Sequence, residues 1–417
     1  MRIGIVGSGV AGLVCAQLLG AIHDVTVLEA DGHLGGHAHT VRVERPDGPL
    51  DVDVGFIVCN DRTYPNFLGL LGQLGVATRA SDMSFSVRDE RSGLEWCGSS
   101  VGTVLAQPHN LLRPGFLRML RDVVRFNGLA RRLAGNPTAP DHTLRDILSA
   151  GRWSDGFVEW YLVPMGSAIW SADPSSLLDM PARTFSTFFE NHGLLRLGGQ
   201  PAWRTVVGGS RAYVDAVVAR SGARFERQCR VEKVVRRDAA TEVRTEAGDL
   251  LEFDHLIVAT HSDQALSLLA DPTPAEREVL GVIRYQPNQA SLHTDERLLP
   301  AARRARASWN YHRLAPDTDR VTLTYDVTRL QGLVPEPRLL LTLNRDDAID
   351  PERVLERFTF NHPVLDAAAV TAQRRRGEIS GRNRTWFVGA YWGYGFHEDG
   401  VVSALPVCRA LGAEVPW

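Results

Sequence analysis

The chain has 417 residues, more than a single hydrophobic core usually serves, so two domains are expected. Its composition is that of a globular protein, with 44% hydrophobic residues, 23% charged residues and a net charge of −3. That charge excludes a general nucleic-acid binder, because no basic excess is available to neutralise phosphates.

The five cysteines are scattered without CxxC spacing, which favours reduced thiols in the cytoplasm and argues against a zinc site. No apolar run reaches membrane-spanning length. The apolar N-terminus is rich in glycine and ends in acids, unlike a signal peptide. A cytoplasmic protein is therefore expected.

The first forty residues have the order strand, turn, helix, strand: MRIGIV, GSGVAG, LVCAQLLGAI and DVTVLEA. The turn contains the GxGxxG spacing, in which the first glycine allows the tight turn, the second lets a pyrophosphate approach the backbone, and the third lets helix and strand pack closely. An acid at the tip of the second strand can accept hydrogen bonds from ribose hydroxyls. The residues predicted to contact a dinucleotide here are Gly7, Gly9, Val10, Ala11, Gly12, Glu29 and Ala30.

Two further stretches, ADGHLGGHAHT and DVDVGFIV, indicate which dinucleotide is bound. With the first forty residues they resemble the extended fingerprint of FAD-dependent oxidoreductases of the flavin-containing amine oxidase and phytoene desaturase superfamily. The resemblance implies FAD as cofactor, with a Gly-Gly pair passing its phosphates and ribityl chain and a later segment running along the flavin ring. His37 stands where the family usually has an arginine. The positions so implied are Gly35, Gly36, His37, Asp53, Gly55, Phe56 and Ile57.

His37 and His39 form an H-x-H pair, which in a strand would place both rings on one face. A metal site would need a third ligand, and the sequence points to none. No metal is predicted, and the pair is interpreted as flavin-proximal or simply packed.

Residues 60 to about 200 show helical periodicity, many aromatics and few clear strands. The segment 114–133 is amphipathic, with Arg118, Arg121, Arg125 and Arg132 at helical spacing. It is either a surface helix facing water or a basic helix lying peripherally on the inner, anionic face of a membrane. The aromatic stretches 160–174 and 183–193 are explained by core packing or by a pocket for an apolar substrate.

The segment 201–218 reads as a strand, a Gly208–Gly209 turn and a helix, and in the resembled superfamily a similar stretch leads the chain back to the FAD domain. Two strand signals follow, RVEKVVRRD and FDHLIVAT. The resemblance places the backbone of Val231 at the adenine and makes the second stretch a further strand of the Rossmann sheet. From about 266 to 375, strands such as YQPNQASLHTD, ASWNYHR, RVTLTYDV and LLLTLN predict an antiparallel sheet under the substrate.

The predicted fold is therefore α/β (α+β overall), with a discontinuous Rossmann-type FAD-binding domain and an amine-oxidase-like substrate domain of mixed or antiparallel sheet plus helices. The FAD-binding domain is assigned to 1–80, 205–265 and 376–417, and the substrate domain to 81–204 and 266–375.

Near the C-terminus, TWFVGA reads as a strand, the glycine-rich stretch as a loop, and EDGVVSALPVCRAL as a helix interrupted by Pro406. Apolar residues at 401, 402, 405, 408 and 411 predict one buried stripe. This resembles the superfamily's C-terminal flavin segment, whose helix points its N-terminus at the flavin. Ala390 stands where the family usually has an acid, and Glu398 or Asp399 either replaces that acid or caps the helix. The implied cofactor contacts are Gly389, Ala390, Phe396, Glu398 and Asp399, and the catalytic candidates are Tyr391, His397 and Glu398.

Lys233 is the only lysine, and it falls on the strand beside the adenine. Typical amine oxidases of the superfamily hold a lysine near flavin N5, and arginine cannot replace it as a titratable group. The chain also resembles a branch of bacterial NAD/FAD-binding proteins that accompany cyclopropane-fatty-acid-synthase-like genes. The resulting hypothesis is an FAD enzyme that desaturates or isomerises a largely apolar substrate, such as a lipid acyl chain. The alternatives are an oxidase of a small amine or amino acid derivative, and a non-catalytic flavoprotein or lipid-binding module.

Overall fold

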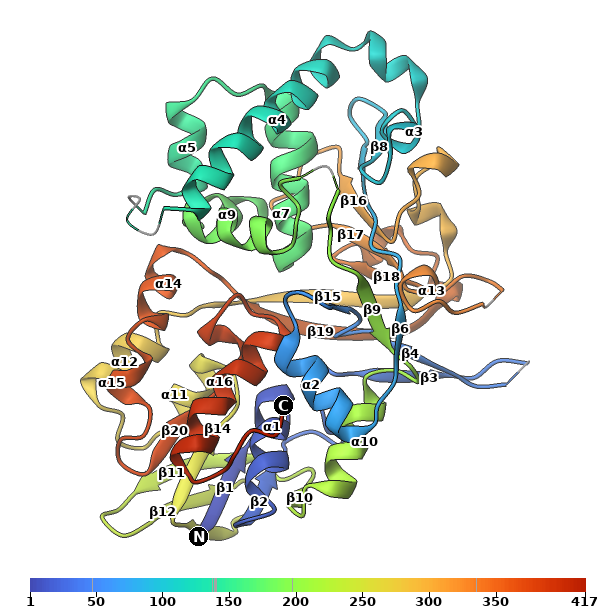
Figure 1. Ribbon diagram of the computed structural model, residues 1–417. Helices are drawn as coiled ribbons and strands as arrows, with labels where there is room; N and C mark the ends of the chain where they lie inside the picture. Colours follow the sequence, from blue (N-terminus) through green and yellow to red (C-terminus); the bar gives the residue numbers. More distant parts are fainter. Residues whose placement is uncertain (47, 137, 139–140, 197, 335) are drawn as a thin grey trace.

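The computed structural model describes residues 1–46, 48–136, 138, 141–196, 198–334 and 336–417. A five-stranded sheet lies at the base of the molecule in Figure 1, and all of its neighbouring strands pair in parallel. Its order is β10-β2-β1-β14-β20, so strands far apart in the sequence lie side by side. The strands are β1 (Arg2–Val6), β2 (Asp24–Leu28), β10 (Arg224–Glu226), β14 (His255–Val258) and β20 (Thr385–Phe387).

Four helices pack together against this sheet, and their apolar side chains form one core with β1 and β2. The N-terminal and C-terminal helices of the chain lie against each other there, as the blue and red ribbons of Figure 1 show. The helices are α1 (Val10–Leu19), α2 (Pro65–Leu74), α10 (Arg211–Arg220) and α16 (His397–Ala410).

The other face of the parallel sheet meets a three-stranded antiparallel sheet and four short helices, which share a second core. These elements are β11 (Val231–Arg236), β12 (Thr241–Thr245), β13 (Leu250–Phe253), α11 (Ser262–Leu268), α12 (Pro274–Leu280), α14 (Ala367–Gln373) and α15 (Arg376–Ile379).

A seven-stranded sheet of order β19-β15-β18-β17-β16-β7-β8 forms the other large layer. Its pairs are antiparallel apart from β16 and β7, which run parallel. The strands are β7 (Phe85–Asp89), β8 (Leu94–Cys97), β15 (Tyr285–His293), β16 (Trp309–Arg313), β17 (Leu323–Asp326), β18 (Leu340–Leu343) and β19 (Val354–Pro363); α13 (Val327–Leu330) follows β17.

A layer of helices covers the end of the molecule opposite the parallel sheet (Figure 1) and shares the largest core with the seven-stranded sheet. It contains α3 (Val101–Val104), the 3₁₀ helix η1 (Pro108–Leu112), α4 (Pro114–Ala134), α5 (Leu144–Ala150), α6 (Asp155–Phe157), the π-helical turn η2 (Val158–Leu162), α7 (Val163–Trp170), α8 (Pro174–Leu178) and α9 (Ala182–Asn191).

Short elements connect the layers. β9 (Trp203–Val206) pairs with β5 (Cys59–Asn60) and β6 (Thr78–Ala80), and β3 (Thr40–Val43) pairs with β4 (Leu50–Asp53). The remaining 3₁₀ turns are η3 (Glu296–Leu298), η4 (Arg303–Ala305), η5 (Asp346–Ala348), η6 (Pro351–Arg353) and η7 (Ala390–Trp392). In the part of the chain that is described, no helix is both long and apolar enough to cross a bilayer.

The predicted α/β class, with a parallel sheet and a second, mostly antiparallel sheet, is confirmed. The domain boundaries stay a prediction, although strands of the parallel sheet come from all three segments assigned to FAD binding. Several local predictions were wrong. The first helix begins at Val10 rather than after the glycine turn, and strands β6, β7 and β8 interrupt the segment read as helical.

The C-terminal helix also differs from its prediction. α16 continues through Pro406 without interruption, because the carbonyl that loses its partner belongs to Val402, on the outer side of the helix. Val402 is 46% exposed, so it does not belong to the predicted buried stripe, whereas Val401, Leu405, Cys408 and Leu411 do.

Candidate cofactor and substrate site

The glycine turn after β1 has the geometry that a diphosphate needs. Gly7 adopts φ +98°, and its N–H donates to the carbonyl of Leu28 at 2.9 Å. A Cβ on Gly12 would lie 2.1 Å from the carbonyl oxygen of Gly7, so only glycine lets α1 approach β1 this closely. A Cβ on Gly9 would meet nothing within 4 Å, so the turn borders open space. Val10 and Ala11 bring helix N–H groups to the same place, where an anion is favoured.

Glu29 ties this turn to the next two segments. Its Oε2 accepts hydrogen bonds from the backbone N–H and the hydroxyl of Ser8, at 2.8 and 2.6 Å, and its Oε1 accepts from the N–H of Asp31 at 3.0 Å. The Ser8 hydroxyl also accepts from the N–H of Gly35 at 3.1 Å. The acid at the end of β2 is thus held rigidly beside the turn, with half-buried Ala30 next to it.

Val231 lies near the same acid. The backbone N–H of Cys229 donates to the carbonyl of Glu29 at 2.8 Å, which brings the start of β11 alongside the end of β2. The side chain of Val231 is buried with Leu28 in one core. This is the neighbourhood that the resemblance assigns to the adenine.

The Gly35–Gly36 pair returns the chain to the glycine turn. Both residues have positive φ, +117° and +57°, and a Cβ on Gly36 would lie 3.2 Å from the Cα of Gly9. Further along, the N–H of Phe56 donates to the carbonyl of His37 at 2.7 Å, and a Cβ on Gly55 would lie 2.1 Å from the same oxygen. The two stretches, which include exposed Gly36 and buried Ile57, therefore form one surface with the glycine turn, which we call the cofactor surface.

Residues 389–400, which we call the C-terminal motif, complete the cofactor surface. The N–H of Gly389 donates to the hydroxyl of Ser403 at 2.9 Å, which fixes the end of β20 against α16. A Cβ on Gly400 would lie 2.5 Å from a methyl carbon of Val10, so α16 packs directly on the first turn of α1. Ala390 is half-buried at the start of η7 and offers no acid.

The two adjacent acids of the motif cap helices. Asp399 accepts a hydrogen bond from the N–H of Phe396 at 2.9 Å, and burial raises its pKa to about 6. Glu398 accepts from the N–H groups of Asn66 and Phe67 at 3.0 and 2.8 Å and from the Asn66 side chain at 2.6 Å. Glu398 thus caps the N-terminus of α2, a role that no local signal in its own motif reveals.

The other two catalytic candidates are buried on different sides of the motif. Tyr391 packs in the core between the parallel sheet and helices α11, α12, α14 and α15. Its hydroxyl has no hydrogen-bond partner among the described residues. His397 stacks on Phe56, with ring centroids 3.6 Å apart, and its Nε2 lies 3.1 Å from the hydroxyl of Tyr213. Burial lowers the pKa of His397 well below its usual value. The structure does not bring Tyr391, His397 and Glu398 together.

The structure brings together three histidines from separate elements. The ring of His37 lies 6.0 Å from that of His261, which follows β14, and 5.6 Å from that of His362, at the end of β19. Burial, reinforced by the neighbouring imidazoles, lowers the pKa of His37 and His261 to about 4 and that of His362 to about 3. The three rings are therefore neutral at pH 7.

His39 belongs to the edge of this cluster. It lies in a loop rather than a strand, stacks on His33 at 4.3 Å and meets Phe358 edge-on at 5.2 Å. Within the described ranges, no group of three or more histidine, cysteine or acidic side chains is placed to hold a metal ion.

His261 and His362 were not predicted as site residues. β19 contains FTFNH, in which Phe358, Phe360 and His362 alternate; Phe358 and Phe360 stack on each other, and all three lie within ring contact of His37 or His39. This alternation could have indicated His362 as a site residue, because a strand puts every second side chain on one face. The position of His261 depends on a loop after β14 and had no comparable signal.

A cavity of about 360 Å³ lies between α9 and the C-terminal motif. Its charged members are already engaged: Arg62 donates to the carbonyl of Gly199, and Glu398 and Asp399 cap helices. Five of its eleven lining residues are aromatic, and Phe188 stacks on Phe396 with ring centroids 5.1 Å apart. The lining residues are Arg62, Thr63, Tyr64, Pro65, Phe188, Asn191, His192, Tyr394, Phe396, Glu398 and Asp399.

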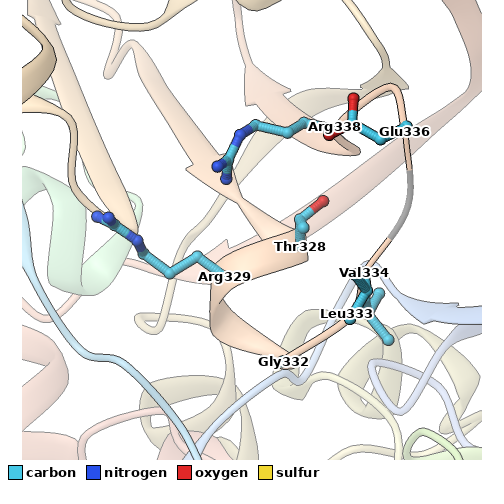
Figure 2. Close-up of a pocket in the computed structure, with 7 residues that line it drawn as sticks. All are labelled: Thr328, Arg329, Gly332, Leu333, Val334, Glu336 and Arg338. Atoms are coloured by element: carbon cyan, nitrogen blue, oxygen red, sulfur yellow. The ribbon is translucent and has the colours of Figure 1, made fainter.

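A second hollow, of about 290 Å³, lies beside α13 and shares no residue with the cofactor surface (Figure 2). Its two arginines are occupied, since Arg338 pairs with Asp326 at 2.9 Å and Arg329 donates to the carbonyl of Arg306 at 2.8 Å. Its lining is Thr328, Arg329, Gly332, Leu333, Val334, Glu336 and Arg338. Nothing in this hollow supplies redox chemistry.

Comparison with known proteins agrees with this geometry. The sequence model of the family described as flavin containing amine oxidoreductase matches residues 10–411. No curated protein matches the chain.

Several solved structures share the fold. Cyclohexylamine oxidase from Brevibacterium oxydans IH-35A superposes with a TM-score of 0.69 at 14% identity, covering 98% of this chain and 99% of that one. A CLA-producing fatty acid isomerase from P. acnes gives 0.68 at 16% identity, and putrescine oxidase with bound putrescine gives 0.68 at 15%; each covers 99% of both chains. The open cradle at Gly9 and the acid at Glu29 fit the adenosine diphosphate of FAD. The chain belongs to the flavin containing amine oxidoreductase family and is an FAD-dependent oxidoreductase.

Proposed function

We propose that this enzyme removes hydride from, or moves a double bond within, a largely apolar substrate such as a lipid acyl chain. The observation that carries the proposal is the aromatic cavity beside the C-terminal motif, in which Tyr64, Phe188, Tyr394 and Phe396 offer apolar surface. Bound FAD supplies the hydride acceptor. The aromatic walls would hold a chain by apolar contact and exclude water.

The neutral histidines and the engaged acids beside the cofactor surface support a substrate whose reacting group is uncharged. His37, His261 and His362 are neutral, and the cavity acids accept hydrogen bonds from backbone N–H groups. The one lysine, Lys233, is exposed on β11 and lies outside the site. A solved structure of the same fold is a fatty acid isomerase, so this architecture accommodates an acyl substrate in at least that protein.

An amine substrate is the second candidate, and one observation favours it. Glu398 and Asp399 both line the cavity, and a carboxylate there would attract an ammonium group. Two of the solved structures with the same fold are oxidases of cyclohexylamine and putrescine.

Anaerobic titration distinguishes the two candidates. The FAD-loaded enzyme is mixed with acyl phospholipids, free fatty acids, or a panel of small amines, and the visible absorbance of the oxidised flavin is followed, because reduction of the flavin bleaches it. Bleaching by acyl compounds alone supports the proposal, and bleaching by amines alone overturns it. Isomerisation leaves the flavin oxidised at the end, so product analysis by mass spectrometry accompanies the titration.

A cytoplasmic enzyme is part of the same proposal. All five cysteines are free, and four of them are buried as small apolar side chains, which suits a reducing compartment.

A further inference from the structure

The outer face of the helical layer has an unusual composition. Every exposed residue of α4 is either an arginine or apolar, and none is acidic. They are Pro114, Leu117, Arg118, Arg121, Val124, Arg125, Arg131 and Arg132. In a chain with a net charge of −3, this helix therefore presents a concentrated positive surface.

The preceding turn, η1, extends this surface with apolar side chains. Leu111 and Leu112 are 47% and 85% exposed, and Leu117, on the first turns of α4, is 46% exposed. Val124 is 70% exposed and lies two turns further along the same face as Leu117. We call Leu111, Leu112, Leu117, Val124 and the five exposed arginines of α4 the α4 surface.

The packing of α4 fixes this orientation. Phe116, Met119 and Phe126 point from the opposite side of the helix into the largest core, and each is at most 1% exposed. Rotation of α4 cannot bury Leu117 and Val124, because it would expose these three side chains to water. Leu117 and Val124 therefore belong to the α4 surface and not to the core.

The arginines of the α4 surface are largely unneutralised. The only acid in α4, Asp122, is buried, accepts from the N–H of Ser154 at 2.9 Å and pairs with Arg121 alone. Arg118 and Arg131 donate to helix carbonyls. Among the described residues, no carboxylate lies within ion-pair distance of Arg118, Arg125, Arg131 or Arg132.

We propose that the α4 surface docks peripherally on an anionic lipid bilayer. Leu111, Leu112 and Leu117 would enter the boundary between headgroups and acyl chains, and the arginines would pair with lipid phosphates. A nucleic acid would use the arginines but would gain nothing from leucines exposed at the start of the helix. Docking does not depend on which substrate the enzyme oxidises, although it would place an enzyme of acyl chains beside its supply.

Vesicle co-sedimentation with the FAD-loaded protein tests this proposal. The vesicles are phosphatidylcholine alone, or phosphatidylcholine mixed in equal amounts with phosphatidylglycerol. The protein is expected to bind the mixed vesicles, to bind neutral vesicles much less, and to be released by high salt, because salt screens exposed charges. Equal binding to both vesicle types, or binding to neither, would overturn the proposal.

Two double variants locate the contact. Arg118→Glu with Arg131→Glu is expected to reduce binding to the mixed vesicles by about tenfold or more, since each basic residue near an anionic surface contributes roughly a fivefold gain. Leu112→Ser with Leu117→Ser removes the apolar contribution and is expected to reduce binding comparably.

Matched controls lie elsewhere on the surface. Val334 is 94% exposed in a loop beyond α13, and Val334→Ser is the control for the leucines. Arg277 on α12 and Arg409 on α16 are exposed, and their change to glutamate matches the arginine pair. Flavin content and thermal unfolding confirm that each variant is folded. Binding that survives in both α4 variants, or that falls equally in the controls, would refute docking through the α4 surface.

Discussion

The side-chain amide of Asn288 lies 3.0 Å from Nδ1 of His362, and the surrounding contacts decide which atom donates. The same amide nitrogen donates to the carbonyl of Ser171 at 3.0 Å, and the Asn288 oxygen accepts from Asn344 at 2.7 Å. Asn288 is therefore the donor and Nδ1 of His362 the acceptor, so the imidazole hydrogen is on Nε2. This relay holds His362 as a neutral hydrogen-bond donor.

Replacing Asn288 with aspartate should reverse this arrangement. An aspartate accepts hydrogen bonds and adds a negative charge, so both effects favour a protonated imidazole. We expect the pKa of His362, now about 3, to rise by about 1–3 units. Histidine-selective NMR titration measures it, with His362→Gln to assign the signal. His312, bonded to Thr324 in the same sheet, is the internal control, and a His362 signal that does not move would contradict the relay.

Two glycine substitutions should separate cofactor binding from folding. Gly9→Ala places a Cβ in open space, so the FAD-free protein should keep its unfolding temperature while the affinity for FAD falls by about tenfold, or ~1.4 kcal/mol. Gly12→Ala puts a Cβ 2.1 Å from a backbone carbonyl and should lower stability as well. Fluorescence titration with FAD and thermal unfolding give the two readouts. Unchanged FAD affinity in Gly9→Ala would show that the diphosphate lies elsewhere.

Glu398 should act on stability rather than on chemistry. Glu398→Ala leaves the N-terminus of α2 without its acceptor and should cost about 0.5–2 kcal/mol of unfolding free energy, the usual effect of losing a helix cap. Glu398→Gln retains one acceptor oxygen and should lose less. Denaturant unfolding measures both, and turnover with an identified substrate should change little in Glu398→Gln. A folded Glu398→Gln enzyme with abolished turnover would restore Glu398 as a catalytic candidate.

The buried and half-buried histidines with lowered pKa values should make the FAD-free protein sensitive to acid. Their folded pKa values lie below the unfolded value of 6.5, so the unfolded chain binds more protons as the pH falls from 6.5 towards 4, and stability is lost in that window. Five carboxyls act in the opposite direction, because burial raises the pKa of Asp53 and Asp399 to about 6 and also raises the pKa of Glu159, Asp173 and Asp326. Their stabilising contribution is present at low pH and is lost as the pH rises through the raised pKa. The histidines outnumber them: His37, His39, His192, His255, His261, His293, His312, His362 and His397 all have lowered pKa values.

Urea unfolding at pH 7 and pH 5 checks this expectation. The unfolding free energy should be lower at pH 5, and His37→Gln should reduce the pH dependence by up to about 1.4 kcal/mol per pH unit. His109→Gln, at an exposed position of η1, is the matched control for the loss of one imidazole from the chain. Stability that rises on acidification would mean that the carboxyls outweigh the histidines.

The glycine turn after the first strand was predictable from the sequence because it is short and requires glycine, whereas the contacts of the named residues with FAD stay a prediction. A Cβ on Gly12 or Gly55 would collide with a backbone carbonyl, and Gly7 adopts a positive φ of +98° that other residues rarely take. FAD was implied by the resemblance of these stretches to the flavin-containing superfamily, and family membership agrees with it.

Residues whose role depends on a distant partner were not predictable. Glu398 caps α2, more than 300 positions earlier in the chain, and His362 acquires its tautomer from Asn288 on a neighbouring strand. Strands β7 and β8 were missed because their residues join a sheet that is otherwise built from residues 285–363. In each case the role of the residue depends on a contact with a distant segment, which the neighbouring sequence does not indicate.

The packing of α16 on α1 has a consequence for how the enzyme is made. Gly400 packs on Val10, and β20 belongs to the same sheet as β1, so the two halves of the cofactor surface leave the ribosome 390 positions apart (400 − 10 = 390). At about 5–20 residues per second, roughly 20–80 s separate them. Until Thr385 and the residues after it emerge, the apolar side of α1 that faces α16 has no cover. The FAD surface can therefore be completed only after β20 and α16 have been synthesised and have packed on β14 and α1.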